Sequence, residues 1–349
     1  MSNSIKIGER QIGAGERCFI IAEVAQSHEG SIGAAHAFID AAADAGVDAI
    51  KFQTHIADAE STLDETFRVR LSGQDKTRYD YWKRMEFTAE EWAGLAEHAN
   101  KRGLTFLSSV FSVPALHLLD RLGVPAWKFG SGEIATSDLL DAALATKKPL
   151  LISTGMSGYG EIEKTAKLVR GKGGQFALFQ CTSRYPNPLE KVGLNVMDEL
   201  RRFDCPVGLS DHSGSPHPAL LALARGADML ELHVTFSRRM YGPDVPSSVT
   251  FEEMKSIVAA RDAFRTIDAN PVDKNAEAAE LKPMKALFGK SVAPARDLPA
   301  GTALTRDMLT LKKPGTGIPA DTIDTLVGRR LGRAVFANRL LTKDDLEGK

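Results

Sequence analysis

The stretch AADAGVDAIKF, residues 42–52, joins a helical pattern to a buried strand through a single glycine, Gly46. Glycine readily adopts the left-handed backbone conformation that ends a helix, and the apolar run after it is typical of a covered strand. The segment therefore predicts a helix, a tight turn and a strand. The same unit recurs as RLGVPAWKF at 121–129 and as LARGADMLEL at 223–232.

Repetition of this unit predicts the fold of the first two-thirds of the chain. Strands are expected at 18–23, 49–53, 105–109, 126–130, 149–153, 176–182, 206–210 and 229–234. Helical patterns lie between them, as at 33–45, 89–101, 161–170, 216–224 and 251–264. Strands that alternate with helices form a parallel sheet, and eight such units in about 250 residues predict an α/β fold, the closed (β/α)₈ TIM barrel. A doubly wound open sheet is the alternative, although no GxGxxG opens the first helix.

After residue 268 the repeated helix–strand pattern ends, and a polar segment and short strand-like stretches follow. We expect a barrel domain at 1–268, a polar linker with some helical character at 269–284, and a small, mostly β module at 285–349. A module of this size has a marginal core of its own, so it is expected to lean on its own barrel or on that of a neighbouring copy.

Bulk composition excludes several classes of protein. The formal net charge is −1 at pH 7 and the basic residues are scattered, which argues against a nucleic-acid surface or a membrane-bound basic face. No apolar run reaches membrane-spanning length, and the first residues lack the apolar stretch of a signal peptide. Three cysteines without CxxC spacing suggest reduced thiols. We therefore expect a cytoplasmic protein.

Polar residues gather at the carboxyl ends of the predicted strands, where a TIM barrel builds its active site. Examples are Glu23, Lys51, Gln53, Ser109, Lys128, Ser131, Glu133, Ser153, Ser183, Ser210, Asp211, His212 and His233. Burying an unpaired charge costs several kcal/mol, so a purely structural barrel would not need ionisable groups there. The pattern favours an enzyme over a scaffold.

Two histidines end the last two predicted strands: His212 in GLSDHSG (208–214) and His233 in LELHVTF (230–236). Neighbouring strands lie about 4.8 Å apart, so both imidazoles can reach one point in space. Neutral imidazoles bind divalent cations, and a site with only two protein ligands suits Mg²⁺ or Mn²⁺ better than structural zinc. Asp211 or Glu231 is a candidate to orient a ring. The alternative is that both are core histidines hydrogen-bonded to neighbours.

Lys51 and Lys128 lie within strand ends, where a long cation is unusual. Each can pair with Glu23 or Glu133, or bind an anion. Because the sequence has no Walker loop, lysines and serine hydroxyls would have to hold a phosphate or a carboxylate. A Schiff-base role for one lysine is the rival hypothesis.

Two loops add candidates at the mouth of the barrel. Asp244, in YGPDVPSS (241–248), either caps a turn or accepts hydrogen bonds from a polyol substrate. Tyr185, in TSRYPNP (182–188), is more typical of packing than of substrate contact.

Taken in order, several motifs resemble the sialic acid synthase family. They are FIIAEVAQSHEGS, AGVDAIKFQTH, WKFGSGE, ISTGM, QCTSRYPNPLE, GLSDHSG, LELHVTF and GPDVPSS. The tail, with SVAPARDLPAGTALTRDMLTLKKPGTGI and LVGRRLGR, resembles the family's C-terminal antifreeze-like (SAF) domain. The resemblance covers nearly the whole chain.

This resemblance implies a reaction: condensation of phosphoenolpyruvate with the aldehyde of an N-acetylhexosamine such as N-acetylmannosamine, giving a nine-carbon keto acid and phosphate. It further implies that His212 and His233 hold Mn²⁺ or Mg²⁺ and that Glu23 lies beside the reacting carbons. The residues that match the family's phosphoenolpyruvate site are Lys51, Ser109, Lys128, Ser131, Ser153, Ser183 and Ser210. Those that match its acceptor-sugar site are Glu133, Tyr185 and Asp244.

Three positions depart from the family pattern. Ser27 stands where asparagine usually precedes the histidine of the SHEG motif, and Ser183 stands where asparagine is found near phosphoenolpyruvate. Lys313, in KPGTG, stands where the family has an arginine that reaches the sugar across a domain-swapped dimer. Lysine is a point charge and lacks the planar fork of arginine, so the acceptor can differ. A pseudaminic or legionaminic acid precursor, or a sugar-binding protein of polysaccharide assembly without catalysis, remain alternatives.

A homodimer follows from the same resemblance. If each SAF module closes the barrel of its partner, the small module gains the support that its own core lacks. A module packed on its own barrel is the alternative.

Overall fold

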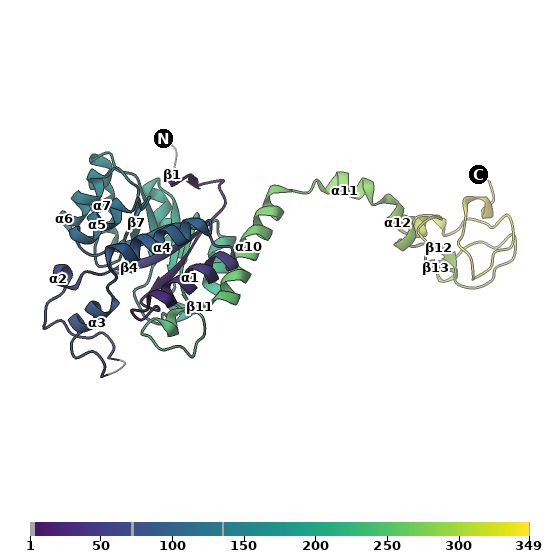
Figure 1. The fold of residues 1–349 in the computed structure, drawn as a ribbon. Helices are drawn as coiled ribbons and strands as arrows, with labels where there is room; N and C mark the ends of the chain where they lie inside the picture. The colour runs from purple at the N-terminus through teal and green to yellow at the C-terminus, as the bar shows by residue number, and fades with distance from the viewer. Residues whose placement is uncertain (1–3, 71–72, 135, 349) are drawn as a thin grey trace. The chain divides into compact units, whose positions relative to one another are not determined.

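The computed structural model describes residues 4–70, 73–134 and 136–348. The chain divides into two compact units, one up to Ala269 and one from Asn270 onward (Figure 1). Among the described residues, no helix combines the length and the apolarity needed to cross a bilayer.

The first unit confirms the predicted TIM barrel. Within the described residues, a parallel sheet runs from β3 to β10 and closes because β10 pairs with both β9 and β3. Its strands are β3 (Phe19–Ala25), β4 (Ala49–Thr54), β5 (Thr105–Val110), β6 (Trp127–Phe129), β7 (Leu150–Ser153), β8 (Phe176–Cys181), β9 (Val207–Asp211) and β10 (Met229–Thr235).

Helices follow the barrel strands, as the repeated unit requires (Figure 1). They are α1 (Ile32–Ala45), α4 (Ala89–Lys101), α5 (Val113–Arg121), α6 (Ser137–Ala145), α7 (Tyr159–Gly171), α8 (Asn195–Leu200), α9 (His217–Ala224) and α10 (Phe251–Ala269). The loop after β4 also carries α2 (Ala57–Glu60) and α3 (Arg78–Met85), and β11 (Val249–Thr250) extends the sheet beside β10. An antiparallel hairpin, β1 (Ser4–Ile7) with β2 (Arg10–Gly13), precedes the barrel.

The stretch at 42–52 behaves as its sequence predicts. Ser31 caps the start of α1 by accepting a hydrogen bond from the Ala34 amide, and Gly46 ends the helix with φ of 78°. Asp48 then accepts from the Ile20 amide at 2.9 Å and pairs with the buried Arg261 at 2.6 Å. These contacts tie the start of β4 to β3 and to the last barrel helix.

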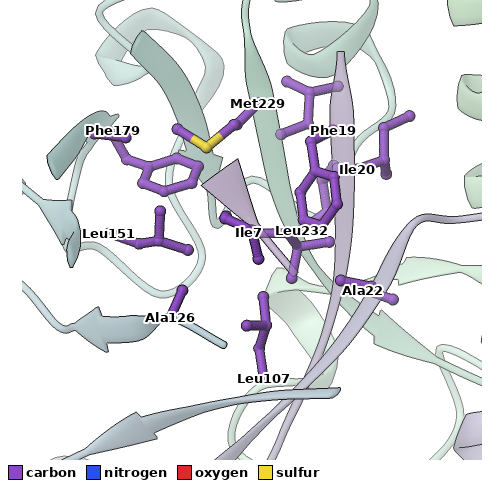
Figure 2. Packing of buried hydrophobic residues seen from close by; sticks show 14 of the residues in the cluster. Ile7, Phe19, Ile20, Ala22, Leu107, Ala126, Leu151, Phe179, Met229 and Leu232 are labelled. Atoms are coloured by element: carbon purple, nitrogen blue, oxygen red, sulfur yellow. The ribbon is translucent and has the colours of Figure 1, made fainter. Parts of the chain in front are cut away.

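Alternation along the strands separates the core from the site. Figure 2 shows Leu107, Ala126, Leu151, Phe179 and Met229 in the buried cluster, together with Ile7 from the hairpin. Successive strand residues point to opposite faces, so the residue two positions later on each strand points into the same interior, nearer its carboxyl end. Those later residues are Ser109, Lys128, Ser153, Cys181 and Glu231.

The second unit has its own small core. An antiparallel pair, β12 (Ser291–Pro294) with β13 (Leu309–Lys312), packs with irregular segments around Val292, Leu298 and Leu331. The buried Asp345 carboxylate pairs with Arg333 and Arg339, each at 2.5 Å. The stretch expected to be a linker, 269–284, carries α11 (Lys274–Glu280) and the beginning of α12 (Lys282–Phe288).

Candidate active site

A cavity of about 590 Å³ opens at the carboxyl ends of the barrel strands. The residues predicted for the site that belong to the barrel all line it, namely Glu23, Lys51, Ser109, Lys128, Ser131, Glu133, Ser153, Ser183, Tyr185, Ser210, His212, His233 and Asp244. Lys313 belongs to the second unit, and its role at the sugar stays a prediction.

Four buried charges form the floor of this cavity. Lys51 Nζ lies 2.6 Å from Glu23 Oε2 and 3.6 Å from Glu231 Oε1. Lys128 Nζ lies 3.4 Å from the same Glu231 oxygen. The pairing of lysines with carboxylates satisfies groups that would be costly to bury alone. The same carboxylates partly neutralise the two lysines, so an anion that binds here interacts with less than their full positive charge.

Burial and neighbouring charges set the protonation of this floor. Burial, opposed by Lys51 and reinforced by Glu231, raises the pKa of Glu23 to about 7. Burial alone would raise the pKa of Glu231, but Lys128 and Lys51 outweigh it and hold that pKa below its usual value. Burial lowers the pKa of Lys128, whereas for Lys51 the two carboxylates more than offset burial and raise the pKa. Glu23 is therefore the floor carboxylate that gains or loses a proton near neutral pH.

Serine hydroxyls surround the two lysines. Lys51 donates to Ser109 Oγ at 3.0 Å, and Lys128 donates to Ser153 Oγ at 2.7 Å. Gly155 makes room for two more hydroxyls, because a Cβ there would lie 2.5 Å from Ser183 Oγ and 2.8 Å from Ser131 Oγ. Ser131 accepts from the Gly155 amide at 3.0 Å. Ammonium groups and hydroxyls in this arrangement suit a phosphate or a carboxylate.

The two histidines face each other beside this floor, as predicted. Their ring centroids are 5.0 Å apart with an interplanar angle of 71°. Burial lowers the pKa of His212 to about 4 and the pKa of His233 well below its ordinary value, so both rings are neutral at physiological pH.

The hydrogen bonding of these rings fits a divalent metal ion. His212 Nδ1 lies 3.2 Å from the Thr182 carbonyl oxygen, which can only accept, so Nε2 keeps its lone pair. His233 Nδ1 is buried without a hydrogen-bond partner in the described structure. The Thr182 carbonyl therefore orients His212, whereas Asp211 bonds to Ser213 instead. Across residues 4–70, 73–134 and 136–348, no group of three His, Cys, Asp or Glu side chains forms a closed metal site.

The mouth of the cavity carries the acceptor-site candidates. Tyr185 packs on His212, with ring centroids 4.1 Å apart, and Arg68 lies 4.4 Å over the Tyr185 ring. Arg68 also bonds to Asp244 Oδ1 at 3.3 Å. Burial raises the pKa of Asp244, opposed by Arg68, and burial raises the pKa of Glu133. These groups offer hydrogen bonds to a polyhydroxylated ligand.

The sequence suggested Glu231 as a residue that orients a histidine ring, but in the structure this carboxylate pairs with Lys51 and Lys128. Its place in the cavity follows from strand alternation, because an acid two residues before His233 points to the same face of β10. Sequence reasoning did not place Arg68 in the site. Arg68 lies in the long loop after β4, which has no periodic pattern to fix its direction.

Comparisons with known protein families match both units of the chain. The NeuB family model matches residues 38–271, and the SAF domain model matches residues 289–347. The second match confirms the predicted C-terminal module.

Relatives of known activity are similar over nearly their whole length. N,N'-diacetyllegionaminic acid synthase from Legionella pneumophila is 34% identical, over 99% of this chain and 100% of the relative. N-acetylneuraminate-9-phosphate synthase from Homo sapiens is 31% identical, over 92% of this chain and 90% of the relative. The crystal structure of N-acetylneuraminic acid synthetase from Leptospira borgpetersenii, in complex with citrate, has a TM-score of 0.71 at 31% identity and covers 83% of this chain and 99% of that chain.

Proposed function

Because the chain belongs to the NeuB family and resembles synthases of N,N'-diacetyllegionaminic acid and N-acetylneuraminate 9-phosphate, we propose that it condenses phosphoenolpyruvate with the open-chain aldehyde of an N-acetylhexosamine. The products would be a nonulosonic acid and phosphate. The observation that carries the proposal is the convergence of two neutral imidazoles, two buried lysines and a ring of serine hydroxyls on one cavity.

The reaction forms one C–C bond and breaks one C–O bond. The enol C3 of phosphoenolpyruvate attacks the aldehyde carbon, and positive charge develops at C2. Water then adds to C2, and the tetrahedral intermediate expels phosphate by C–O cleavage. Lys51, Lys128 and the serines would hold the phosphate and carboxylate, because preorganised donors stabilise charge without reorganisation.

Glu23 is suited to the change of charge at C2. As a carboxylate it would stabilise the developing cation, and it would then accept a proton from the attacking water. A pKa of about 7 makes both protonation states of Glu23 accessible near neutral pH. His212 and His233 would hold Mn²⁺ or Mg²⁺, which when bound supplies Lewis acidity for the aldehyde oxygen.

The assembly and the acceptor are part of the proposal. We propose a domain-swapped homodimer in which Lys313 of one chain serves the acceptor sugar of the other. A legionaminic acid precursor is as well supported as N-acetylmannosamine, since an N,N'-diacetyllegionaminic acid synthase and an N-acetylneuraminic acid synthetase match at 34% and 31% identity.

The proposal is tested by phosphate release from phosphoenolpyruvate with a panel of N-acetylhexosamines, with chelator and with Mn²⁺ or Mg²⁺ restored. We expect release with at least one acceptor, loss on chelation and recovery with metal. His212→Ala should abolish turnover. Unchanged turnover in that variant would refute the metal assignment.

One observation favours a second candidate, a Schiff-base aldolase. Burial lowers the pKa of Lys128, and a neutral amine is the nucleophile that such chemistry needs. Borohydride trapping with pyruvate would label Lys128 in an aldolase and would label nothing in the condensing synthase.

A further inference from the structure

His55 ends the motif AGVDAIKFQTH and takes no part in the reaction proposed above. It follows β4 at the wall of the cavity, and it is 6% exposed. Its ring is stacked between Trp82 and Phe111, with centroid distances of 3.9 and 4.4 Å and interplanar angles of 17° and 8°. Both faces of the imidazole are covered, so only its edge, with the two nitrogens, is available for polar contacts.

Those nitrogens connect a buried carboxylate to the floor of the cavity. His55 Nδ1 contacts Glu60 Oε1, and His55 Nε2 lies 3.3 Å from Gln53 Oε1. The Gln53 amide nitrogen donates to Glu23 Oε1 at 3.0 Å. Lys51 holds the other Glu23 oxygen at 2.6 Å. The Glu23 carboxylate is thus held from two sides, and one side depends on the orientation of Gln53.

The directions of these hydrogen bonds follow from what each atom can do. A carboxylate accepts, so the Gln53 atom facing Glu23 is the amide nitrogen and the atom facing His55 is the oxygen. That oxygen also accepts from Gln26 at 3.2 Å. His55 Nε2 therefore donates to Gln53 Oε1, while His55 Nδ1 faces the Glu60 carboxyl group.

We propose that His55 is a positioning residue that fixes the Gln53 amide in the orientation that donates to Glu23. This inference rests on the proposed function. The terminal torsion of glutamine is broad, so without the His55 donor the amide can turn and present its oxygen to Glu23. Glu23 would then lose one of its two partners, and its alignment with the reacting carbon would loosen. The loss is expected in kcat rather than in the binding of phosphoenolpyruvate, which lysines and serines hold.

Three substitutions of His55 separate its contacts. His55→Gln places an amide nitrogen near the position of Nε2 and keeps a donor to Gln53. His55→Asn places its nitrogen near the position of Nδ1 and keeps only the contact with Glu60. His55→Phe keeps the aromatic stack and loses both hydrogen bonds. Thermal unfolding of each variant reports whether the barrel is intact.

We expect kcat to fall about 10- to 100-fold in the Asn and Phe variants, the range seen when orienting contacts are lost. The KM for phosphoenolpyruvate should change less than about threefold, and His55→Gln should recover most of kcat. If the Gln variant is as slow as the Asn variant, or if the Phe variant keeps wild-type kcat, the inference is wrong.

A double-mutant cycle identifies the route through Gln53. If His55 acts on Glu23 only through this amide, adding His55→Phe to Gln53→Leu should slow the enzyme no further. Multiplied effects would overturn the route.

A spectroscopic measurement separates this inference from the proposed function. If the wild-type protein releases no phosphate with any acceptor, the proposed function fails, but the positioning contact can still be measured. In ¹⁵N-histidine NMR, we expect the Nε2 nitrogen of His55 to carry a proton, with its signal shifted in Gln53→Leu. An Nε2 nitrogen without a proton, or an Nε2 signal indifferent to Gln53, would refute the contact.

Discussion

Lys51 is the residue on which the buried charges of the cavity floor depend. It is 1% exposed and lies within ion-pair distance of both Glu23 and Glu231. Lys51→Met should destabilise the fold by about 3–5 kcal/mol, because it leaves the buried Glu23 carboxyl group without its neighbouring cation. Urea unfolding of both proteins measures the change.

A matched double variant shows whether charge is the cause. Lys51→Met combined with Glu23→Gln removes one charge of each sign and should recover a large part of that loss. If the double variant is as unstable as the single one, the cost comes from packing and not from an unpaired carboxylate.

His28 gives the barrel a dependence on pH that does not involve catalysis. Burial, reinforced by His55 and Arg84, lowers the pKa of His28 to about 3. The unfolded chain therefore binds a proton at His28 in a pH range where the folded chain does not. As a result, the free energy of unfolding decreases as pH falls from about 6.5 toward 3. The contribution is up to about 1.4 kcal/mol for each pH unit in this window.

The comparison uses a variant that cannot titrate. His28→Asn keeps an acceptor for the Gly30 amide, which His28 Nδ1 accepts at 3.1 Å. Unfolding free energies measured at pH 7, 6 and 5 should fall less steeply for this variant than for the wild type. Equal slopes of unfolding free energy against pH in the two proteins would show that protonation of His28 does not cause the pH dependence.

The sequence predicted the site residues well on the strands, because strand geometry fixes the direction of each side chain. It predicted them poorly in the loops, where no such rule applies. His212, Lys128 and Ser153 follow from alternation on strands whose carboxyl ends meet on one rim. The partners of His55 do not follow, because Glu60 and Trp82 lie in the insertion after β4. Their contact depends on a path through the loop that no repeat in the sequence encodes.

At the scale of elements, the closure between β9 and β10 depends on Gly208. A Cβ at this position would lie 2.9 Å from Met229 Cβ on the paired strand. Gly208→Ala should therefore cost about 1–3 kcal/mol through overpacking. Thermal unfolding measures the loss.

Gly94, within α4, is the matched control. A Cβ there would meet no atom within 4 Å, and its backbone is helical. Gly94→Ala should stabilise the protein by about 0.5–1 kcal/mol. If both substitutions change the stability in the same direction, the close approach of Gly208 to Met229 does not determine the effect.

Element positions were largely predictable because each unit carries its own boundary signals. The helix predicted at 89–101 has the same bounds as α4, and Thr88 supplies a capping box at its start. The hairpin β1–β2 and the helices α2 and α3 were not anticipated. They are short and lie outside the repeat, so their sequences have too few periodic positions to distinguish them from loops.

At the scale of the whole molecule, the proposed domain swap predicts complementation. A chain with His212→Ala has an inactive barrel, and a chain with Lys313→Glu has an altered SAF module. In swapped heterodimers, one of the two sites combines the intact barrel with the intact module. Unfolding and refolding the two chains together should therefore restore activity that neither homodimer has. If the mixture stays inactive although heterodimers form, each module serves its own barrel.

In the proposed reaction, one cavity joins phosphoenolpyruvate to an amino-sugar aldehyde with C–O cleavage. Its most direct test uses phosphoenolpyruvate labelled with ¹⁸O in the bridging position, an N-acetylhexosamine acceptor and Mn²⁺, followed by mass spectrometry of both products. We expect a nine-carbon 2-keto acid and phosphate in equal amounts, with the label in the phosphate. Label retained in the keto acid, or phosphate formed without the keto acid, would contradict it.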